Sequence, residues 1–223
     1  MLSEMVLGAE SSRALMATSA LAVISPALSI AQSVPQFVRV ARSGATGVSM
    51  PTWMLLLVLS ELWGIYGAFA SVTAEVATNV PCGLLALAIV VVVARRRAVV
   101  CKTLVIAGVL SMAVAAVALA CLLIDRRDIE ADIAVVGSLA IYVPQFARAL
   151  GRCDLDGISP GTWVLACLSA ISWGAYGLLL HKLPVYLPSV VMLPLAVVIL
   201  VRTVRAHARP VRSMLTSRDL GSS

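Results

Sequence analysis

The chain has 223 residues, of which 61% are hydrophobic and only 13% are charged. Its mean hydropathy of +1.00 leaves too little polar surface to cover a soluble globule of this size, so the sequence indicates a membrane protein. The net charge of +6 would suit a nucleic-acid partner in a soluble protein. In a membrane protein the positions of the charges matter more than their sum, and we expect no nucleic-acid partner.

Apolar segments long enough to cross about 30 Å of hydrocarbon follow one another along the chain. Charged residues or short turns separate them. The sequence therefore predicts an all-α membrane protein with seven transmembrane helices, at residues 14–36, 51–70, 73–94, 103–124, 131–150, 161–180 and 183–202.

The basic residues predict the orientation of these helices. Seven crossings place the two ends of the chain on opposite sides of the membrane. If the N-terminus is outside, thirteen of the 17 Lys and Arg residues face the cytoplasm, which is the usual positive-inside bias. We expect a multi-pass protein of the plasma membrane, with residues 1–13 outside the cell and a cytoplasmic tail at 203–223.

Two stretches of the sequence match each other. Val-Pro-Gln-Phe at 34–37 returns at 143–146, and Trp-Gly-x-Tyr-Gly at 63–67 returns at 173–177. The offsets are 109 and 110 positions, so one residue has been inserted between the two motifs. Self-similarity of this kind in an apolar chain is typical of a transporter built from repeats, with its substrate site where the repeats meet.

The segment at 103–124 has no counterpart in either copy. A three-helix unit ends on the side of the membrane opposite its start, so a second copy keeps the same orientation only after one extra crossing. We therefore predict two parallel three-helix repeats, 14–94 and 131–202, joined by a linker helix at 103–124.

The two copies predict one layer of polar and aromatic side chains near the bilayer midplane. Trp63 and Trp173 lie about 15 Å inside the bilayer, and Asn79 and Ser189 return to the same depth after a turn. Aromatic faces pack against the C–H face of a sugar ring while amides and hydroxyls bind its hydroxyl groups, and Ser169 lies one turn before Trp173. Taken singly, such residues more often pack a helix bundle, but their repetition favours a site.

Prolines and acidic residues complete the set of candidates. We expect four prolines to act as hinges around the cytoplasmic mouth, because proline removes a helical hydrogen bond and lets a helix bend. An intramembrane carboxylate is a candidate proton site. Glu75 shares a helix face with Asn79, whereas Glu61 should face away from the pocket. The expected hinges are Pro35, Pro51, Pro144 and Pro160.

Trp53 and Trp163 stand close to the predicted starts of their helices. Tryptophan at that depth is commonly an interfacial anchor, so we assign these two residues no substrate role. Glycines of the Trp-Gly-x-Tyr-Gly motifs, including Gly67 and Gly177, are expected to permit close contact between helices.

The doubled Pro-Gln pair, the Trp-Gly-x-Tyr-Gly motifs and the asparagine sixteen residues after Trp63 resemble the PQ-loop superfamily, and within it the SWEET sugar transporters. The resemblance covers about residues 20–94 and 131–205. It implies a 3+1+3 helix arrangement, facilitated diffusion of mono- or disaccharides, and a Trp/Asn pair from each half in a central site. By position these pairs are Trp63 with Asn79 and Trp173 with Ser189, where the family usually keeps a second asparagine.

We therefore expect a sugar uniporter that works by alternating access, with a small sugar and the lipid bilayer as its partners. One alternative is a proton-coupled exporter of an amino acid or another small metabolite, as in cystinosin-like members of the superfamily. Another is a non-transporting receptor or scaffold on the same fold. We expect no catalytic residues, metal or cofactor. The sequence leaves open whether the chain forms a homo-oligomer.

Overall fold

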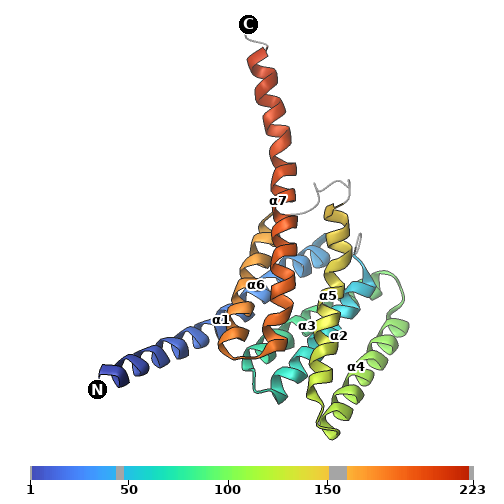
Figure 1. Ribbon diagram of the computed structural model, residues 1–223. Coiled ribbons are helices and arrows are strands. Elements are labelled where there is room, and N and C mark those ends of the chain that lie inside the picture. Colours follow the sequence, from blue (N-terminus) through green and yellow to red (C-terminus); the bar gives the residue numbers. More distant parts are fainter. Residues whose placement is uncertain (1, 44–47, 151–159, 221–223) are drawn as a thin grey trace.

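The structure is a computed structural model that describes the backbone of residues 2–43, 48–150 and 160–220. The side chains of 2–11, 142–150 and 206–220, and those of residues 35, 36, 39, 41, 43 and 127, lie outside the described part. The described residues form seven helices and no strand (Figure 1). The helices are α1 (Leu2–Ser43), α2 (Met50–Phe69), α3 (Thr73–Arg96), α4 (Val100–Leu123), α5 (Arg127–Leu150), α6 (Pro160–Leu179) and α7 (Leu183–Leu220).

The seven predicted helices are confirmed, and the differences lie at their ends. The apolar parts of α1 and α7 run over Ser12–Val34 and Leu183–Arg205, close to the predicted spans. Both helices nevertheless continue beyond the apolar residues, so the segments expected outside the membrane are also helical. Hydropathy reports where a helix enters lipid, whereas the helix itself continues as long as its residues favour that conformation.

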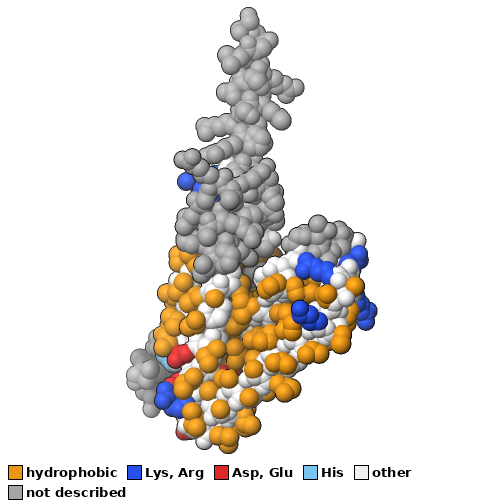
Figure 2. Space-filling model, turned by 90° about the vertical axis from the view of Figure 1, so that its right-hand side faces the viewer, with side chains coloured by type: hydrophobic (Ala, Val, Ile, Leu, Met, Phe, Trp, Pro, Cys, Tyr) orange, Lys and Arg blue, Asp and Glu red, His pale blue; other side chains and the backbone are white. Residues whose placement is uncertain are grey.

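Six of the helices are long and apolar enough to cross a membrane, as judged from the described residues. α5 is not among them, and its first two turns carry Asp128, Glu130 and Asp132. Its crossing stays a prediction. Hydrophobic side chains cover much of the described face in Figure 2, and blue basic side chains gather near its edges. The chain is thus a multi-pass membrane protein.

The turns that follow α2 and α6 are built alike. Ser71 and His181 have positive φ angles of 58° and 54°, and such a left-handed residue ends a helix by turning the chain back. The N–H of Val72 donates to the carbonyl of Gly67 at 2.8 Å, and that of Lys182 donates to Gly177 at 2.9 Å. Each turn therefore delivers the next helix directly against the one before it.

Gly67 and Gly177 make this close approach possible. A Cβ atom added at Gly67 would lie 2.5 Å from the Cβ of Glu75, and one at Gly177 would lie 2.6 Å from the backbone nitrogen of Tyr186. Real Cβ atoms do not tolerate such distances. The close-contact role predicted for these two glycines is confirmed.

Two groups of three helices pack in the same order. In the first half, α1–α3, the third helix contacts the other two; in the second half, α5–α7, α7 likewise contacts α5 and α6. The halves meet where α1 packs on α6 and α2 packs on α5. α4 contacts α2, α3 and α5 and lies at the edge of the bundle (Figure 1).

The apolar core differs between the two ends of the bundle. Near the α2–α3 and α6–α7 turns, one large cluster joins both halves and includes Tyr66, Val72, Ala131, Tyr176 and Val185. Towards the opposite end, the clusters among the described residues lie within one half or on its side of the bundle. One unites residues of α1, α2 and α3 with Val48, and another unites α6 with α7. The described core thus seals the halves together at the turn end.

Candidate functional site

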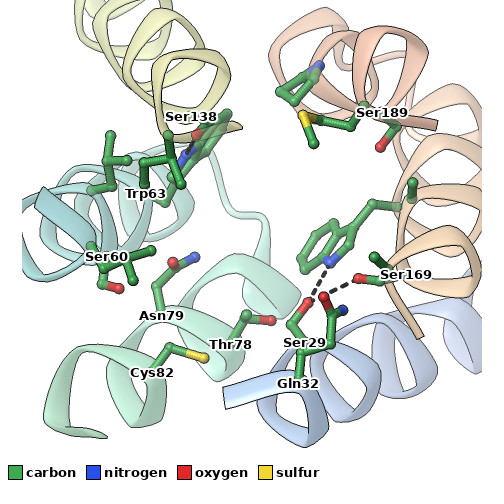
Figure 3. Close-up of a pocket in the computed structure, with 18 of the residues that line it drawn as sticks. Ser29, Gln32, Ser60, Trp63, Thr78, Asn79, Cys82, Ser138, Ser169 and Ser189 are labelled. Carbon is green, nitrogen blue, oxygen red and sulfur yellow. Dashed lines mark hydrogen bonds between the residues drawn. The ribbon is translucent and has the colours of Figure 1, made fainter. Parts of the chain in front are cut away.

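A cavity of about 300 Å³ lies between the two halves. Side chains from all six helices of the halves line it, and none of its described lining residues belongs to α4. Figure 3 shows this convergence: Ser60 and Trp63 come from α2, Asn79 from α3, Ser138 from α5 and Ser189 from α7. The volume is at the lower end of the range for small-molecule sites.

All five residues predicted to bind substrate line this one cavity. They are Trp63, Asn79, Trp173, Ser189 and Ser169. The two tryptophans occupy the same position in their helices, the fourteenth residue of α2 and of α6. Asn79 and Ser189 are both the seventh residue of the following helix. The structure therefore brings these side chains together, and their contact with a substrate stays a prediction.

Both cavity indoles donate hydrogen bonds across the boundary between the halves. Nε1 of Trp63 donates to Oγ of Ser138 on α5 at 2.9 Å, and Nε1 of Trp173 donates to Oγ of Ser29 on α1 at 2.9 Å (Figure 3). Each indole is thus held by the half to which it does not belong. The hydroxyl of Ser138 donates in turn to the carbonyl of Ala134 at 2.8 Å, which fixes the acceptor.

Sequence reasoning did not single out Ser29 and Ser138. Ser138 follows Ser29 by 109 positions, which is the offset between Pro35 and Pro144. An exhaustive comparison of the two copies for repeated polar residues would have found the pair. Its partnership with the tryptophans was not predictable, because the bonds join different halves.

Each indole also rests on the tyrosine one turn later. The rings of Trp63 and Tyr66 lie 5.7 Å apart at an interplanar angle of 86°, and those of Trp173 and Tyr176 lie 5.9 Å apart at 74°. Both arrangements are edge-to-face, which is a favourable geometry for aromatic pairs. The Trp-Gly-x-Tyr-Gly motif therefore supplies the cavity indole, its aromatic support and the glycine of the hairpin contact.

The two seams between the halves differ in how many polar side chains they contain. Along the α1–α6 seam, the hydroxyls of Ser25 and Ser172 lie 2.6 Å apart and those of Ser29 and Ser169 lie 3.3 Å apart. Along the α2–α5 seam, Leu59 packs on Gly137, where an added Cβ would lie 2.5 Å from the Leu59 Cδ2 atom. The α1–α6 seam therefore carries a row of serine hydroxyls, whereas the α2–α5 seam combines this apolar contact with the Trp63–Ser138 hydrogen bond.

The two candidate acidic residues occupy different environments. Glu75 lines the cavity and is only 6% exposed, and Nδ2 of Asn79 donates to its Oε2 atom at 2.9 Å. Glu61 does not line the cavity. The hydroxyl of Ser111 on α4 donates to its Oε1 atom at 2.6 Å, so Glu61 faces the α4 side of α2 as its helical position predicts. A proton-binding role stays a prediction for both.

Of the four candidate hinges, the two with described side chains, Pro51 and Pro160, do not line the cavity. Pro51 lies in the first turn of α2, where it is exposed, and Pro160 is the first residue of α6. The backbone of α1 passes through Pro35 and that of α5 through Pro144, whose side chains lie outside the described part of the chain. Hinge motion at these four positions stays a prediction.

The interpretation of Trp163 as an interfacial anchor is wrong. Its indole is 6% exposed and packs with Ala196 and Ile199 in a cluster formed by α6 and α7. Trp53 is half-buried beside α3 residues. Depth along the helix suggested contact with headgroups, but the helix face that each residue occupies decides whether protein or lipid surrounds it.

The described residues contain no group of three or more His, Cys, Asp or Glu side chains placed to hold a metal ion. No model of a protein family matches the sequence, and no curated protein matches it either. The structure, in contrast, is similar to that of a eukaryotic SWEET transporter, with a TM-score of 0.75 and 14% sequence identity. The match covers 86% of this chain and 98% of that one, so the chain has a SWEET-like fold.

Proposed function

We propose that this SWEET-like chain is a membrane carrier that moves a mono- or disaccharide down its concentration gradient by alternating access. The observation that carries the proposal is the cavity between the halves, to which each half contributes one tryptophan and one polar residue at matching helical positions. A site shared by two packed halves becomes accessible from either side when they rock against each other. Such motion needs no energy source besides the substrate gradient.

The uneven core of the bundle supports this mechanism. The cluster that joins both halves lies near the α2–α3 and α6–α7 turns, and those described towards the other end lie on one side or the other. We propose that the protein lies in the plasma membrane with its N-terminus outside the cell and its C-terminus in the cytoplasm. In this orientation the end that carries the α2–α3 and α6–α7 turns faces outwards. Rocking would open that cluster and close the cytoplasmic end around the predicted proline hinges.

Tracer flux into proteoliposomes tests the proposal. We expect candidate sugars to equilibrate across the membrane, and Trp63→Ala or Trp173→Ala to lower the initial rate at least about tenfold, because each removes an aromatic wall of the cavity. Trp53→Ala is the matched control, since Trp53 lies on α2 but does not line the cavity. Flux that survives both cavity variants would contradict the proposed site.

A second candidate is a proton-coupled carrier of an amino acid or another small metabolite. Glu75 favours it, because an intramembrane carboxylate in a carrier cavity is a candidate proton site. An imposed pH gradient should then drive uptake against the substrate gradient, and Glu75→Gln should abolish that response. Uptake indifferent to pH in the unaltered protein would remove this candidate.

A further inference from the structure

Glu75 is the one charged side chain among the described residues that line the cavity, and no Lys, Arg or His joins it there. It is the third residue of α3, with 6% of its surface exposed. A carboxylate withdrawn from water without a positive partner is unstable, more so within the hydrocarbon thickness of a membrane. The described lining therefore supplies no positive charge that would neutralise it.

Most hydrogen-bond donors around the cavity already have acceptors within the protein. The described donors that are engaged in this way are Nε1 of Trp63 and of Trp173, Nδ2 of Asn79, Nε2 of Gln32, and the hydroxyls of Ser33, Thr78 and Ser138. The hydroxyls of Ser29 and Ser169 share one further bond. The described contacts include no bond from the hydroxyls of Ser60 and Ser189. Among the described lining residues, these two hydroxyls and one proton of the Ser29–Ser169 pair are the donors left for a ligand.

The hydrogen-bond acceptors around the cavity, in contrast to its donors, are largely available to a ligand. Nδ2 of Asn79 donates both to the main-chain carbonyl of Glu75 and to its Oε2 atom, each at 2.9 Å. The amide nitrogen of Asn79 is therefore engaged one turn back along α3, which leaves Oδ1 as the group that Asn79 presents to a ligand. Carboxylate and amide oxygens then stand within one helical turn on the same face.

From this imbalance we propose that the cavity selects a ligand carrying a protonated amino group on a hydroxylated skeleton, such as an amino sugar, with the ammonium group at Glu75 and Asn79. An ammonium group brings three donors and the missing positive charge, and its hydrogen bonds to a carboxylate are charge-assisted. The two indoles of the cavity also tolerate a cation beside them. An anionic ligand would meet Glu75 with no compensating base.

This inference rests on the proposed carrier site, and equilibrium binding tests it separately from transport. The purified full-length protein in detergent is titrated with glucosamine, glucose and glucuronate at neutral pH, where most of the glucosamine is protonated, with binding followed by calorimetry. These sugars share the pyranose ring. Glucosamine carries an amino group in place of the C2 hydroxyl of glucose, and glucuronate carries a carboxylate in place of its hydroxymethyl group. We expect glucosamine to bind at least about tenfold more tightly than glucose, and glucuronate to bind more weakly than both.

Variants assign the preference to the carboxylate. Glu75→Gln should bring the ratio of glucosamine to glucose affinity close to one, whereas Glu75→Asp, which keeps the charge, should retain part of it. Glu61→Gln is the matched control, because Glu61 contacts Ser111 and not the cavity. An amino preference that persists in Glu75→Gln would overturn the inference, as would glucuronate binding as tightly as glucose.

A second ligand set separates the failure of this inference from that of the sugar proposal. Ethanolamine, ethylene glycol and glycolate repeat the same charge series without a sugar ring. A preference for ethanolamine with no sugar binding would keep the cationic subsite and reject the sugar carrier. Sugar binding without any amino preference would reject the subsite and keep the carrier, and a pH effect without amino preference would mean that Glu75 binds only a proton.

Discussion

Trp63 of the first half donates its indole hydrogen bond to Ser138 of the second half, 2.9 Å away, and Trp173 does the reverse with Ser29. The residues expected to touch substrate are therefore also the residues that tie the halves together. Relative motion of the halves must either move these indoles or break their hydrogen bonds. Ligand contact and movement of the halves are thus coupled through the same two side chains.

A double-mutant cycle measures this coupling. Trp63→Phe removes the donor and Ser138→Ala removes the acceptor, so each alone should lower thermal stability and the pair should not be additive. We expect a coupling free energy of about 0.5–1.5 kcal/mol, the usual contribution of a buried hydrogen bond. Differential scanning fluorimetry in detergent provides the four stabilities. Strictly additive effects would show that the bond contributes nothing.

Gly67→Ala should destabilise the α2–α3 hairpin. The new methyl group would lie 2.5 Å from the Cβ of Glu75, so one helix must shift, which costs on the order of 1–3 kcal/mol in a packed core. Gly108→Ala is the control, because Gly108 on α4 has no heavy atom within 4 Å of an added Cβ, apart from its own local backbone. There the same substitution should leave the melting temperature unchanged or raise it.

Cys82 offers a direct probe of the cavity, since its thiol lines the wall while Cys121 is buried elsewhere on α4. In a variant that keeps Cys82 as its sole cysteine, a small thiol-reactive reagent should modify the residue and lower flux. Saturating substrate should slow the modification several-fold by occupying the same space. A matched variant that keeps Cys121 alone should show no protection, and equal protection of both thiols would indicate a global change of conformation.

The hydroxyl of Ser111 donates a hydrogen bond to the carboxylate of Glu61 where α2 contacts α4. Ser111→Ala should lower the free energy of unfolding by about 1–3 kcal/mol, because it withdraws a donor from a carboxylate in apolar surroundings. The preference among substrates should not change, since neither residue lines the cavity. Ser19→Ala, at an exposed position of α1, is the control and should alter neither stability nor transport.

Hydropathy and internal repetition were enough to predict the seven helices and the meeting of Trp63, Asn79, Trp173 and Ser189. Depth in a membrane follows from counting residues at a fixed helical rise, and the two copies supply the count twice. Polar contacts between different helices follow no such rule. The bonds from the indoles to Ser29 and Ser138 depend on how the halves are rotated against each other, which neither copy encodes alone.

The direction in which a side chain faces was harder to predict than its depth in the membrane. Glu61 faces away from the cavity as expected because its angle could be measured against Trp63 on the same helix. For Trp163 depth alone was considered, and the interpretation failed because α7 covers that face. The lengths of α1 and α7 were underestimated for a related reason. Hydropathy indicates which part of a helix lies in lipid, but it does not indicate where the helix itself begins and ends.

Because the cavity is formed by both halves, a bound ligand that contacts both of them stabilises their association. The halves then behave like the subunits of a dimer whose stability depends on the concentration of the bound ligand. A ligand concentration one hundred times the dissociation constant would add about 2.7 kcal/mol to the free energy of unfolding. A search for the true cargo can therefore begin with whichever compounds make the detergent-solubilised protein most resistant to heat.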